Sequence, residues 1–417
     1  MKRNNLLILA IAALILVILA FIKNSKSSEN KTALLISKKI FPEFPVNDIT
    51  AIEISDANNS LQVQKKDNEW CIPSRFNYPV EFAKVRDILL KVSEMKIGQT
   101  VKLSEKQLSS LKLVKPATGV TNAGTFVRFI DSRGNQAASL LIGETRKKQM
   151  EGADNIFFGG YPDGQYISSD EGKNAYLISE PLFGFTPNAK EWFDAELLNI
   201  PSTEISEITI TRSGKQDVTL KQNENGKMVV DGISKREETD DSKTSSTQSS
   251  LSFFRMDDIA DPSLSDEETG MNNPIVFEAK TKKGEIYRVK IGKVNAESNY
   301  YVRLAMDLTP EAGLPPPQPP QSSTNATEET TNTQSQAAQK SERDDLEQKM
   351  TAFNNKCGRW TYLIASYKVA PMMYKRDDLV ITKKEAEQKA KEQEKKEEIK
   401  EQKEAKKKKG FFPFWKK

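Results

Sequence analysis

An extended apolar segment, a polar turn and a second extended segment ending in Ile-Gly occur twice in this sequence. Residues 126–143 read FVRFIDSRGNQAASLLIG, and residues 276–292 read VFEAKTKKGEIYRVKIG. Gly134 and Gly284 lie among polar residues, where a hairpin turn needs a positive φ. Neither segment has the GxGxxG or GxxxxGK[ST] spacing that wraps a phosphate. We therefore predict a hairpin that is used twice, in which Gly143 and Gly292 end strands.

The repeat extends toward the N-terminus of both segments. Residues 48–72 and 204–230 each begin with spaced isoleucines, followed by a polar turn and two further extended runs. Such alternation is typical of strands with one buried face. The aligned isoleucines are Ile49, Ile52 and Ile54 in the first segment and Ile205, Ile208 and Ile210 in the second. Both segments are therefore predicted to be three-stranded meanders.

Two helices are predicted in each copy. Residues 82–95 carry apolar side chains three or four positions apart, which indicates an amphipathic helix. Its counterpart at 249–259 follows a polar stretch at 234–250 and is predicted to be shorter. Ser104 and Ser265 each precede an acidic residue and are predicted N-caps of a short helix. The apolar set of the first helix is Phe82, Val85, Ile88, Leu89, Val92 and Met95.

These matches divide the chain into two tandem copies, residues 42–199 and 200–381. Each copy is predicted to be an α+β domain of mostly antiparallel sheet with one amphipathic helix and one short helix. The second copy carries an insertion at 313–341 that is rich in Pro, Gln, Ser and Thr. Such a composition cannot bury a core, so the insertion is predicted to be disordered.

The N-terminus carries a membrane-targeting signal. Uncharged apolar residues fill positions 6–22, directly after a short basic segment. At about 1.5 Å per residue, a helix of this length can cross the bilayer core. No small-x-small cleavage site follows promptly, which favours an uncleaved anchor. We expect residues 1–4 in the cytoplasm, a transmembrane helix at 5–22, a linker at 23–41 and the remaining chain outside the cytoplasm.

The C-terminal segment, residues 382–417, is dominated by Lys and Glu and has no apolar stripe. It is predicted to be a solvated charged helix or a disordered tail. Its tip reads KKKKGFFPFWKK. Aromatic side chains flanked by lysines suit a bilayer interface or a groove on a partner, and the alternative is an unbound solubilising tail. The predicted docking residues are Phe411, Phe412, Phe414 and Trp415.

The composition of the chain excludes several kinds of catalytic and metal-binding site. The sequence contains no histidine, which excludes His-based triads and His-ligated zinc. Cys71 and Cys357 are too few for a Cys-only metal site, and we interpret them as separately buried, with a disulfide as the alternative. Adjacent acids such as Asp240 and Asp241 point apart on a helix or a strand. We therefore predict no catalytic, cofactor-binding or metal site.

The charge balance argues against nucleic-acid binding. The chain has 62 Lys and Arg against 58 Asp and Glu, and the excess of basic residues lies in the C-terminal tail. A nucleic-acid-binding domain normally carries a basic surface, which the body of this chain lacks.

The assembled pattern resembles a bacterial family known as domain of unknown function 4340. The resemblance rests on the apolar N-terminus and on ITAIEI, NEWCI, YPVEFAKVRDILLKV, the LLIG hairpin, YLIS and WFDAELL in the first copy. Weaker forms occur in the second copy, where Met228 replaces Trp70. Members of that family are commonly encoded beside ABC-transporter permeases and gliding-motility-type auxiliary subunits. The resemblance implies an accessory protein of an ABC-type complex, with no catalytic residues to carry over.

Three functions are compatible with these features. The leading prediction is a non-enzymatic accessory or scaffold protein with a single membrane anchor in the bacterial inner membrane, a periplasmic body and protein partners in a transporter complex. The alternative is a periplasmic module that binds cell-wall glycan or polysaccharide in a groove between the copies. A His-free hydrolase is the third possibility and would need a carboxylate or Ser/Lys site.

Overall fold

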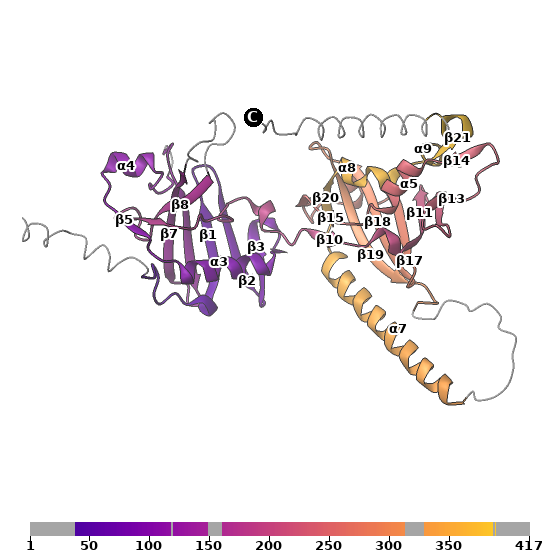
Figure 1. Cartoon of the computed structure of the whole chain (residues 1–417), viewed down its shortest axis with the longest axis horizontal. Helices are drawn as coiled ribbons and strands as arrows, with labels where there is room; N and C mark the ends of the chain where they lie inside the picture. The colour runs from indigo at the N-terminus through magenta and orange to yellow at the C-terminus, as the bar shows by residue number, and fades with distance from the viewer. Residues whose placement is uncertain (1–37, 118–119, 149–160, 313–328, 387, 389–417) are drawn as a thin grey trace, which may run out of the picture. The chain divides into compact units, whose positions relative to one another are not determined.

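The computed structural model describes residues 38–117, 120–148, 161–312, 329–386 and 388 (Figure 1). The chain divides into two compact units, Met1–Asp194 (unit 1) and Ala195–Lys417 (unit 2). Each unit is built on one antiparallel sheet with few helices, as the sequence predicted. The division falls slightly before the predicted boundary at 199/200, because residues 196–198 pair with a strand of unit 2.

Unit 1 contains a nine-stranded sheet with the spatial order β4-β3-β2-β1-β6-β7-β8-β9-β5 among its described residues. The meander β1–β3 predicted from the isoleucine pattern lies on one side of the predicted hairpin β6–β7, and β8 and β9 lie on the other side. The strands are β1 (Ile49–Ser55), β2 (Ser60–Lys66), β3 (Glu69–Ile72), β4 (Tyr78–Pro79), β5 (Gln99–Val101), β6 (Thr125–Asp131), β7 (Gln136–Lys148), β8 (Tyr161–Ser168) and β9 (Ala175–Ile178).

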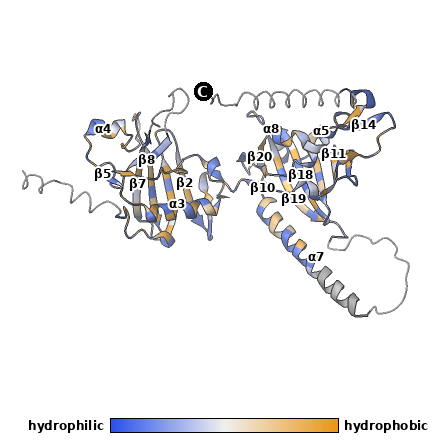
Figure 2. Ribbon diagram, viewed as in Figure 1, coloured by the Kyte–Doolittle hydropathy of each residue, from blue (hydrophilic) through white to orange (hydrophobic). Residues whose placement is uncertain are grey.

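The core of unit 1 lies on one face of its central strands. Period-two alternation places Ile52, Ile54, Val127 and Phe129 on that face, and all four are buried. The ring of Phe44 meets the ring of Phe129 edge-on, with 5.2 Å between centroids. The opposite face carries paired polar side chains such as Arg128 and Glu53 over β1 and β6. The hydropathy colouring of the strands follows this mixture of apolar and polar positions (Figure 2).

The amphipathic helix α3 (Phe82–Glu94) forms as predicted and lies across the strands of unit 1 (Figure 1). Its buried stripe consists of Val85, Ile88, Leu89 and Val92. Burying one such side chain is worth about 1.5–3 kcal/mol, so this stripe fixes the orientation of the helix. The short helix α4 (Glu105–Ser110) begins at the predicted N-cap Ser104, which forms a capping box with Gln107. Three 3₁₀ turns, η1 (Val46–Asp48), η2 (Pro73–Arg75) and η3 (Ala189–Glu191), complete the unit.

Phe82 departs from the prediction, because its side chain is 63% exposed instead of buried. It is the first residue of α3, and helical side chains lean toward the N-terminus. The ring of Phe82 therefore projects beyond the end of the helix, away from the strands that bury the rest of the apolar stripe.

Unit 2 contains an eight-stranded sheet with the order β13-β12-β11-β17-β18-β19-β20-β16 among its described residues. This order matches that of unit 1 when β11–β13, β17–β20 and β16 take the places of β1–β3, β6–β9 and β5. Its main strands are β11 (Ile205–Arg212), β12 (Lys215–Gln222), β13 (Met228–Val230), β16 (Asp258–Ile259), β17 (Ile275–Thr281), β18 (Glu285–Val294), β19 (Asn299–Leu308) and β20 (Tyr362–Ala365).

Two small strand pairs and several short helices flank the sheet of unit 2. The pairs join β10 (Glu196–Leu198) to β15 (Phe254–Arg255) and β14 (Glu237–Thr239) to β21 (Val380–Thr382). Ser265 caps α6 through a capping box with Glu268, as predicted. The helical elements are η4 (Ser202–Glu204), α5 (Asp241–Gln248), α6 (Asp266–Thr269), α7 (Glu329–Cys357), α8 (Ser366–Val369), η5 (Ala370–Met373) and α9 (Arg376–Leu379).

The shorter counterpart of α3 in the second copy does not lie where the sequence predicted it. We expected it at 249–259, but that segment forms a turn and the strands β15 and β16, while the preceding polar stretch forms α5. The carboxylate of Asp240 accepts hydrogen bonds from the N–H groups of Ser242 and Lys243 and so begins the helix. Thr244 and Thr247 bury their hydroxyls by donating to backbone carbonyls, so a polar sequence can pack here.

Helix α7 corrects the prediction of a disordered insertion at 313–341. Residues 329–341 belong to this helix, and residues 313–328 lie outside the described residues. The C-terminal half of α7 packs on β19 and buries Leu346 and Cys357. Seven of the 13 residues at 329–341 are Ala, Gln, Glu or Lys, which favour helix once the chain is anchored on one side.

The predicted transmembrane helix at 5–22 and most of the charged tail lie outside the described residues. Among the residues described, no helix combines the length and apolar character needed to cross a bilayer. The tail begins as a helix after Thr382, whose hydroxyl and N–H form a capping box with the Glu385 carboxylate.

Candidate protein-binding surface

The repeated hairpins of β6–β7 and β17–β18 are closed by their own hydrogen bonds. In unit 1, the Asp131 carboxylate accepts from the N–H groups of Arg133 and Asn135 at 2.9 and 2.8 Å. The bond from Asn135 is the main reason that the pKa of Asp131 is lowered. In unit 2, the Thr281 hydroxyl takes the same place and accepts from the N–H of Glu285 at 3.1 Å. These polar groups are therefore engaged in the turn, which favours the hairpin interpretation over a phosphate site.

Gly134 and Gly284 adopt the positive φ that the turn requires, at 82° and 85°. Gly143 and Gly292, in contrast, do not end strands, and that prediction is wrong. Strands β7 and β18 continue past them to Lys148 and Val294. A Cβ at Gly143 would lie 2.3 Å from the Leu111 carbonyl oxygen, and one at Gly292 would lie 2.1 Å from the Thr269 carbonyl oxygen. Both glycines allow the C-terminal end of the short helix, at Leu111 after α4 and at Thr269 in α6, to lie in contact with the strand.

Helix α3 and the loop beside it expose large apolar side chains in unit 1. Phe183 is 70% exposed, Phe82 is 63% exposed and Leu90 is 43% exposed. The loop carrying Phe183 lies against the first turn of α3, because a Cβ on Gly184 would be 3.6 Å from Cε of Lys84. We call Phe82, Phe183 and this turn the aromatic end of the α3 surface. Exposed clusters of this kind mark protein-binding sites more often than chance.

Lys84 holds the aromatic end in place. Its Nζ donates to the Glu191 carbonyl oxygen at 2.5 Å and lies 4.9 Å from the centroid of the Trp192 ring. Burial lowers the pKa of this amine, and the nearby Glu191 and Glu81 carboxylates oppose that shift. The indole N–H of Trp192 donates to the Thr186 carbonyl oxygen at 2.8 Å, which ties the same loop to the core. The exposed rings therefore stand on a rigid base.

A groove of about 790 Å³ lies along α3, between the helix and the segment that follows β9. Its lining combines the apolar residues Leu90, Met95, Ile178 and Leu182 with three lysines and three acids. Protein interfaces also combine apolar and polar contacts. The charged residues of the lining are Lys39, Lys91, Lys96, Asp87, Glu94 and Glu180. We call Lys39, Lys91 and Lys96 the lysine end of the α3 surface.

The strongest charged cluster in unit 2 braces α7 against the sheet. The Glu285 carboxylate is buried and accepts from Lys349 Nζ of α7 at 2.6 Å, from the Thr281 hydroxyl at 3.1 Å and from the Tyr287 hydroxyl at 3.3 Å. Burial, followed by the Glu285 charge, raises the pKa of Tyr287. Partial burial acts to lower the pKa of Lys349, but the bonds to Glu285 and Tyr287 raise it overall.

The brace is completed by ring packing and by an edge contact. The Phe353 ring of α7 packs edge-on against Tyr287 with 5.9 Å between centroids. The Asn354 amide donates to the carbonyl oxygen of Met306 in β19 and accepts from its N–H, both at 2.8 Å. Every polar group of this cluster faces another group of the same unit, so we interpret it as a structural brace for α7.

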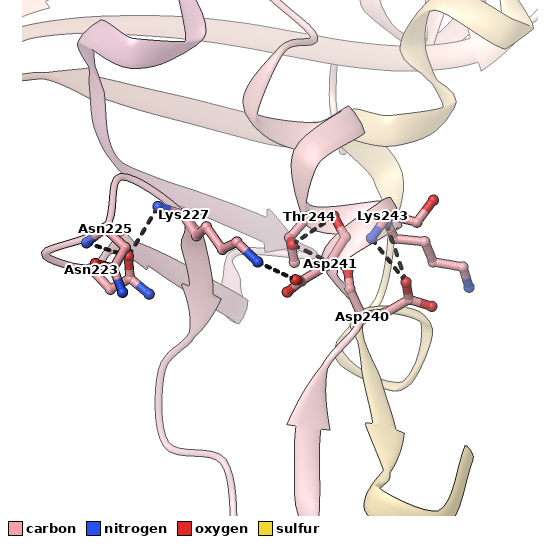
Figure 3. A network of polar contacts seen from close by, with 8 residues as sticks. Asn223, Asn225, Lys227, Asp240, Asp241, Lys243 and Thr244 are labelled. Carbon is pink, nitrogen blue, oxygen red and sulfur yellow. Dashed lines mark hydrogen bonds and ion pairs between the residues drawn. The ribbon is translucent and has the colours of Figure 1, made fainter. Parts of the chain in front are cut away.

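The adjacent acids Asp240 and Asp241 serve different partners, as the sequence predicted. Figure 3 shows Asp240 at the start of α5, accepting from the Lys243 N–H, while Asp241 meets Lys227. The Lys227 Nζ lies 2.7 Å from Asp241 Oδ2, which raises the pKa of Lys227. The two carboxylates therefore do not form a shared acid–base pair. Among the described residues, no group of three or more Cys, Asp or Glu side chains could hold a metal ion.

The remaining candidates from the sequence lie in the core or outside the described residues. Cys71 and Cys357 are both buried and are not joined in a disulfide, as we interpreted them. The docking residues predicted in the tail, Phe411, Phe412, Phe414 and Trp415, lie outside the described residues. The exposure of Phe183 had no signal in the sequence, since a Phe in a loop is usually buried. The early position of Phe82 in its helix was a usable hint that its ring would leave the buried stripe.

Comparison with known proteins identifies one family. No curated protein sequence and no solved structure matches this chain. A family model described as a domain of unknown function, DUF4340, matches residues 70–274, a narrower range than the 42–381 that the sequence features suggested. This range runs from Trp70 in β3 of unit 1 to the residue before β17 in unit 2. The segment 70–274 therefore belongs to the DUF4340 family, which the sequence features resemble.

Proposed function

We propose that this protein is a non-enzymatic, membrane-anchored accessory or scaffold protein that acts outside the cytoplasm as an auxiliary component of an ABC-type transporter complex. The observation that carries the proposal is the aromatic end of the α3 surface, with Phe82 and Phe183 exposed on a rigid base. Large aromatic side chains are the residues that most often dominate protein-binding energy. Their exposure is unfavourable in water unless a partner covers them.

Two features of the sequence support the membrane part of the proposal. The uncharged apolar stretch at 6–22 has the length and composition of a transmembrane helix. The family resemblance adds that genes of this family are commonly found beside ABC-transporter genes. A protein that is fixed to the membrane needs little affinity in solution to bind a membrane-embedded partner, because anchoring raises their effective concentration.

The proposal is tested by crosslinking in native membranes followed by affinity purification of the full-length chain. We expect a permease and its ATPase to copurify with the wild-type chain. The double substitution Phe82→Asp with Phe183→Asp should lower their yield about tenfold or more, since interface aromatics commonly contribute 2 kcal/mol or more each. The matched control is Tyr367→Asp, which changes an exposed aromatic residue of unit 2.

Two results would count against the proposal. If wild-type purifications contain no transporter subunit above the background of a membrane protein of similar abundance, the transporter role is wrong. If the subunits copurify equally with the wild type and with the folded Phe82→Asp, Phe183→Asp variant, the aromatic end is not the contact. Thermal unfolding of each variant shows whether it is folded.

A further inference from the structure

The lysine end of the α3 surface contains an unusual like-charge pair. Lys39 and Lys96 lie directly opposite each other in an isolated antiparallel bridge. The flanking hydrogen bonds run from Ile40 N to Met95 O and from Ile97 N to Lys38 O, each 2.9 Å long. This pattern makes Lys39 and Lys96 a non-hydrogen-bonded pair, in which opposed side chains come closest. Like charges in this position repel each other.

A third lysine joins this pair from another element. Lys91 lies in the last turn of α3 and lines the same groove as Lys39 and Lys96. Three carboxylates also line the groove, and one of them, Asp87, is paired with Arg86 at 2.8 Å. The other two carboxylates, Glu94 and Glu180, form no ion pair within 4.0 Å in the part of the chain that the structure describes. The lysines are therefore free to meet an anion from outside.

The sequence places this cluster close to the proposed anchor. The apolar stretch ends at residue 22, and the chain enters unit 1 at Lys38 and Lys39. A chain of that length spans about 55 Å at most. An anchor at 6–22 would hold the lysine end within that distance of the bilayer, and the exposed Leu90 of the same groove supplies an apolar contact.

We propose that the lysine end of unit 1 binds the anionic surface of the membrane, with Lys39, Lys91 and Lys96 contacting lipid phosphate groups and Leu90 entering the headgroup region. The proposal rests on the proposed membrane anchor. Each Lys near an anionic surface favours contact by about fivefold, which also relieves the repulsion between Lys39 and Lys96.

The test uses the full-length chain in vesicles of phosphatidylcholine, with or without 30% phosphatidylglycerol. A fluorophore on Leu90→Cys reports contact through quenching by brominated lipid, and Cys71 and Cys357 are buried. We expect strong quenching only with phosphatidylglycerol, weakening at high salt. Lys39→Glu with Lys96→Glu should lower the contact equilibrium by about twentyfold or more. The matched control is Lys65→Glu with Lys66→Glu, which changes the charge equally on exposed positions of β2.

The outcomes separate this inference from the proposed function. A chain that is washed off the vesicles by alkaline carbonate has no anchor, which contradicts the proposed function. A chain that stays in the vesicles but shows equal quenching with and without phosphatidylglycerol contradicts the lysine contact. Equal loss in the two charge-reversal variants would show a general charge effect and also overturn it. Quenching abolished by millimolar inorganic phosphate at constant ionic strength would identify a soluble phosphate as the ligand instead of the membrane.

Discussion

Gly143 in β7 and Gly292 in β18 occupy equivalent places in the two units, each directly after an isoleucine. In both, a backbone carbonyl at the C-terminal end of the short helix lies within 2.3 Å of where a Cβ would be. At Gly143 the approach also forms a hydrogen bond, from the N–H of Glu144 to the Leu111 carbonyl oxygen at 2.8 Å. The Ile-Gly pair thus lies where two chain segments cross in contact. From the sequence alone, such a position could not be distinguished from the end of a strand.

This contact predicts a specific destabilisation. Gly143→Ala should lower the free energy of unfolding by about 1–3 kcal/mol, because the new methyl group forces backbone atoms apart. Gly134→Asn is the control, since a Cβ at Gly134 meets nothing within 4 Å and Asn tolerates a positive φ. Urea unfolding of both variants makes the comparison. Equal losses would mean that the turn, and not the crossing, makes glycine necessary.

The ion pair between Glu237 of β14 and Arg376 of α9 makes stability depend on pH. The two Arg376 Nη atoms donate to the two carboxylate oxygens at 3.3 and 2.9 Å. Those bonds lower the pKa of Glu237 from 4.5 to about 2. Because the pKa of Glu237 is lower in the folded protein than in the unfolded chain, the ionised carboxylate stabilises the fold at pH values above about 4.5. This contribution disappears as the pH falls from about 4.5 toward 2.

The difference in thermal midpoint between the wild type and Glu237→Gln should therefore shrink as the pH falls from 6 to 3. Glu238→Gln, which changes the exposed neighbour in β14, is the control and should show no such trend. A difference that stays constant over this pH range would show that the ion pair does not contribute.

Among the helices, the sequence predicted those whose signals are local. The stripe of α3 and the N-caps of α4 and α6 depend on residues within one or two turns, and the structure confirms them. The sequence did not predict α5, because the face of this helix that packs against the unit is polar. Thr247 donates to the carbonyl oxygen of Pro371, a residue far along the chain, so no periodic apolar pattern marks this helix. Apolar periodicity detects only helices that bury hydrocarbon.

Helix α7 is also held by a contact between residues far apart in the sequence. Strand β20 covers β19 only between Asn299 and Val302, and the Asn354 amide satisfies the backbone of Met306 beyond that point. Asn354→Ala should cost about 1–3 kcal/mol, because the N–H and carbonyl of Met306 lose their partner. Asn355→Ala, at an exposed position of α7, should change stability by less than about 0.5 kcal/mol.

Hydrogen exchange over residues 303–308 distinguishes these outcomes. Faster exchange is expected in Asn354→Ala and unchanged exchange in Asn355→Ala. If both variants exchange like the wild type, α7 does not protect this edge of the sheet.

For the whole molecule, the repeated pattern predicted two sheets of similar construction, and the two strand orders agree after equivalent strands are matched. Alternation within each strand was readable because it reflects one buried face. The order of strands across each sheet, and the exposure of Phe82 and Phe183, depend on contacts between distant segments and could not be read from the sequence. The candidate binding surface was therefore found from the structure, whereas the membrane anchor remains a prediction from the sequence.

The two units have sheets with corresponding strand orders, and they differ most in the helices and loops that surround those sheets. Unit 2 carries α7 with its buried Glu285–Lys349 brace, whereas unit 1 presents the α3 surface with exposed aromatic rings and unpaired lysines. This difference suggests that the units have separate roles, with unit 1 as the part that contacts the membrane and its proteins.

Site-specific photo-crosslinking in living cells tests the central claim most directly. A photoreactive amino acid replaces Phe183 in the full-length chain, and the same replacement at Tyr367 is the control, since both side chains are largely exposed. We expect the Phe183 position to form a crosslinked product containing an ABC-transporter permease and the Tyr367 position to form none. Products that are identical at the two positions, or a Phe183 product that contains only soluble proteins, would contradict it.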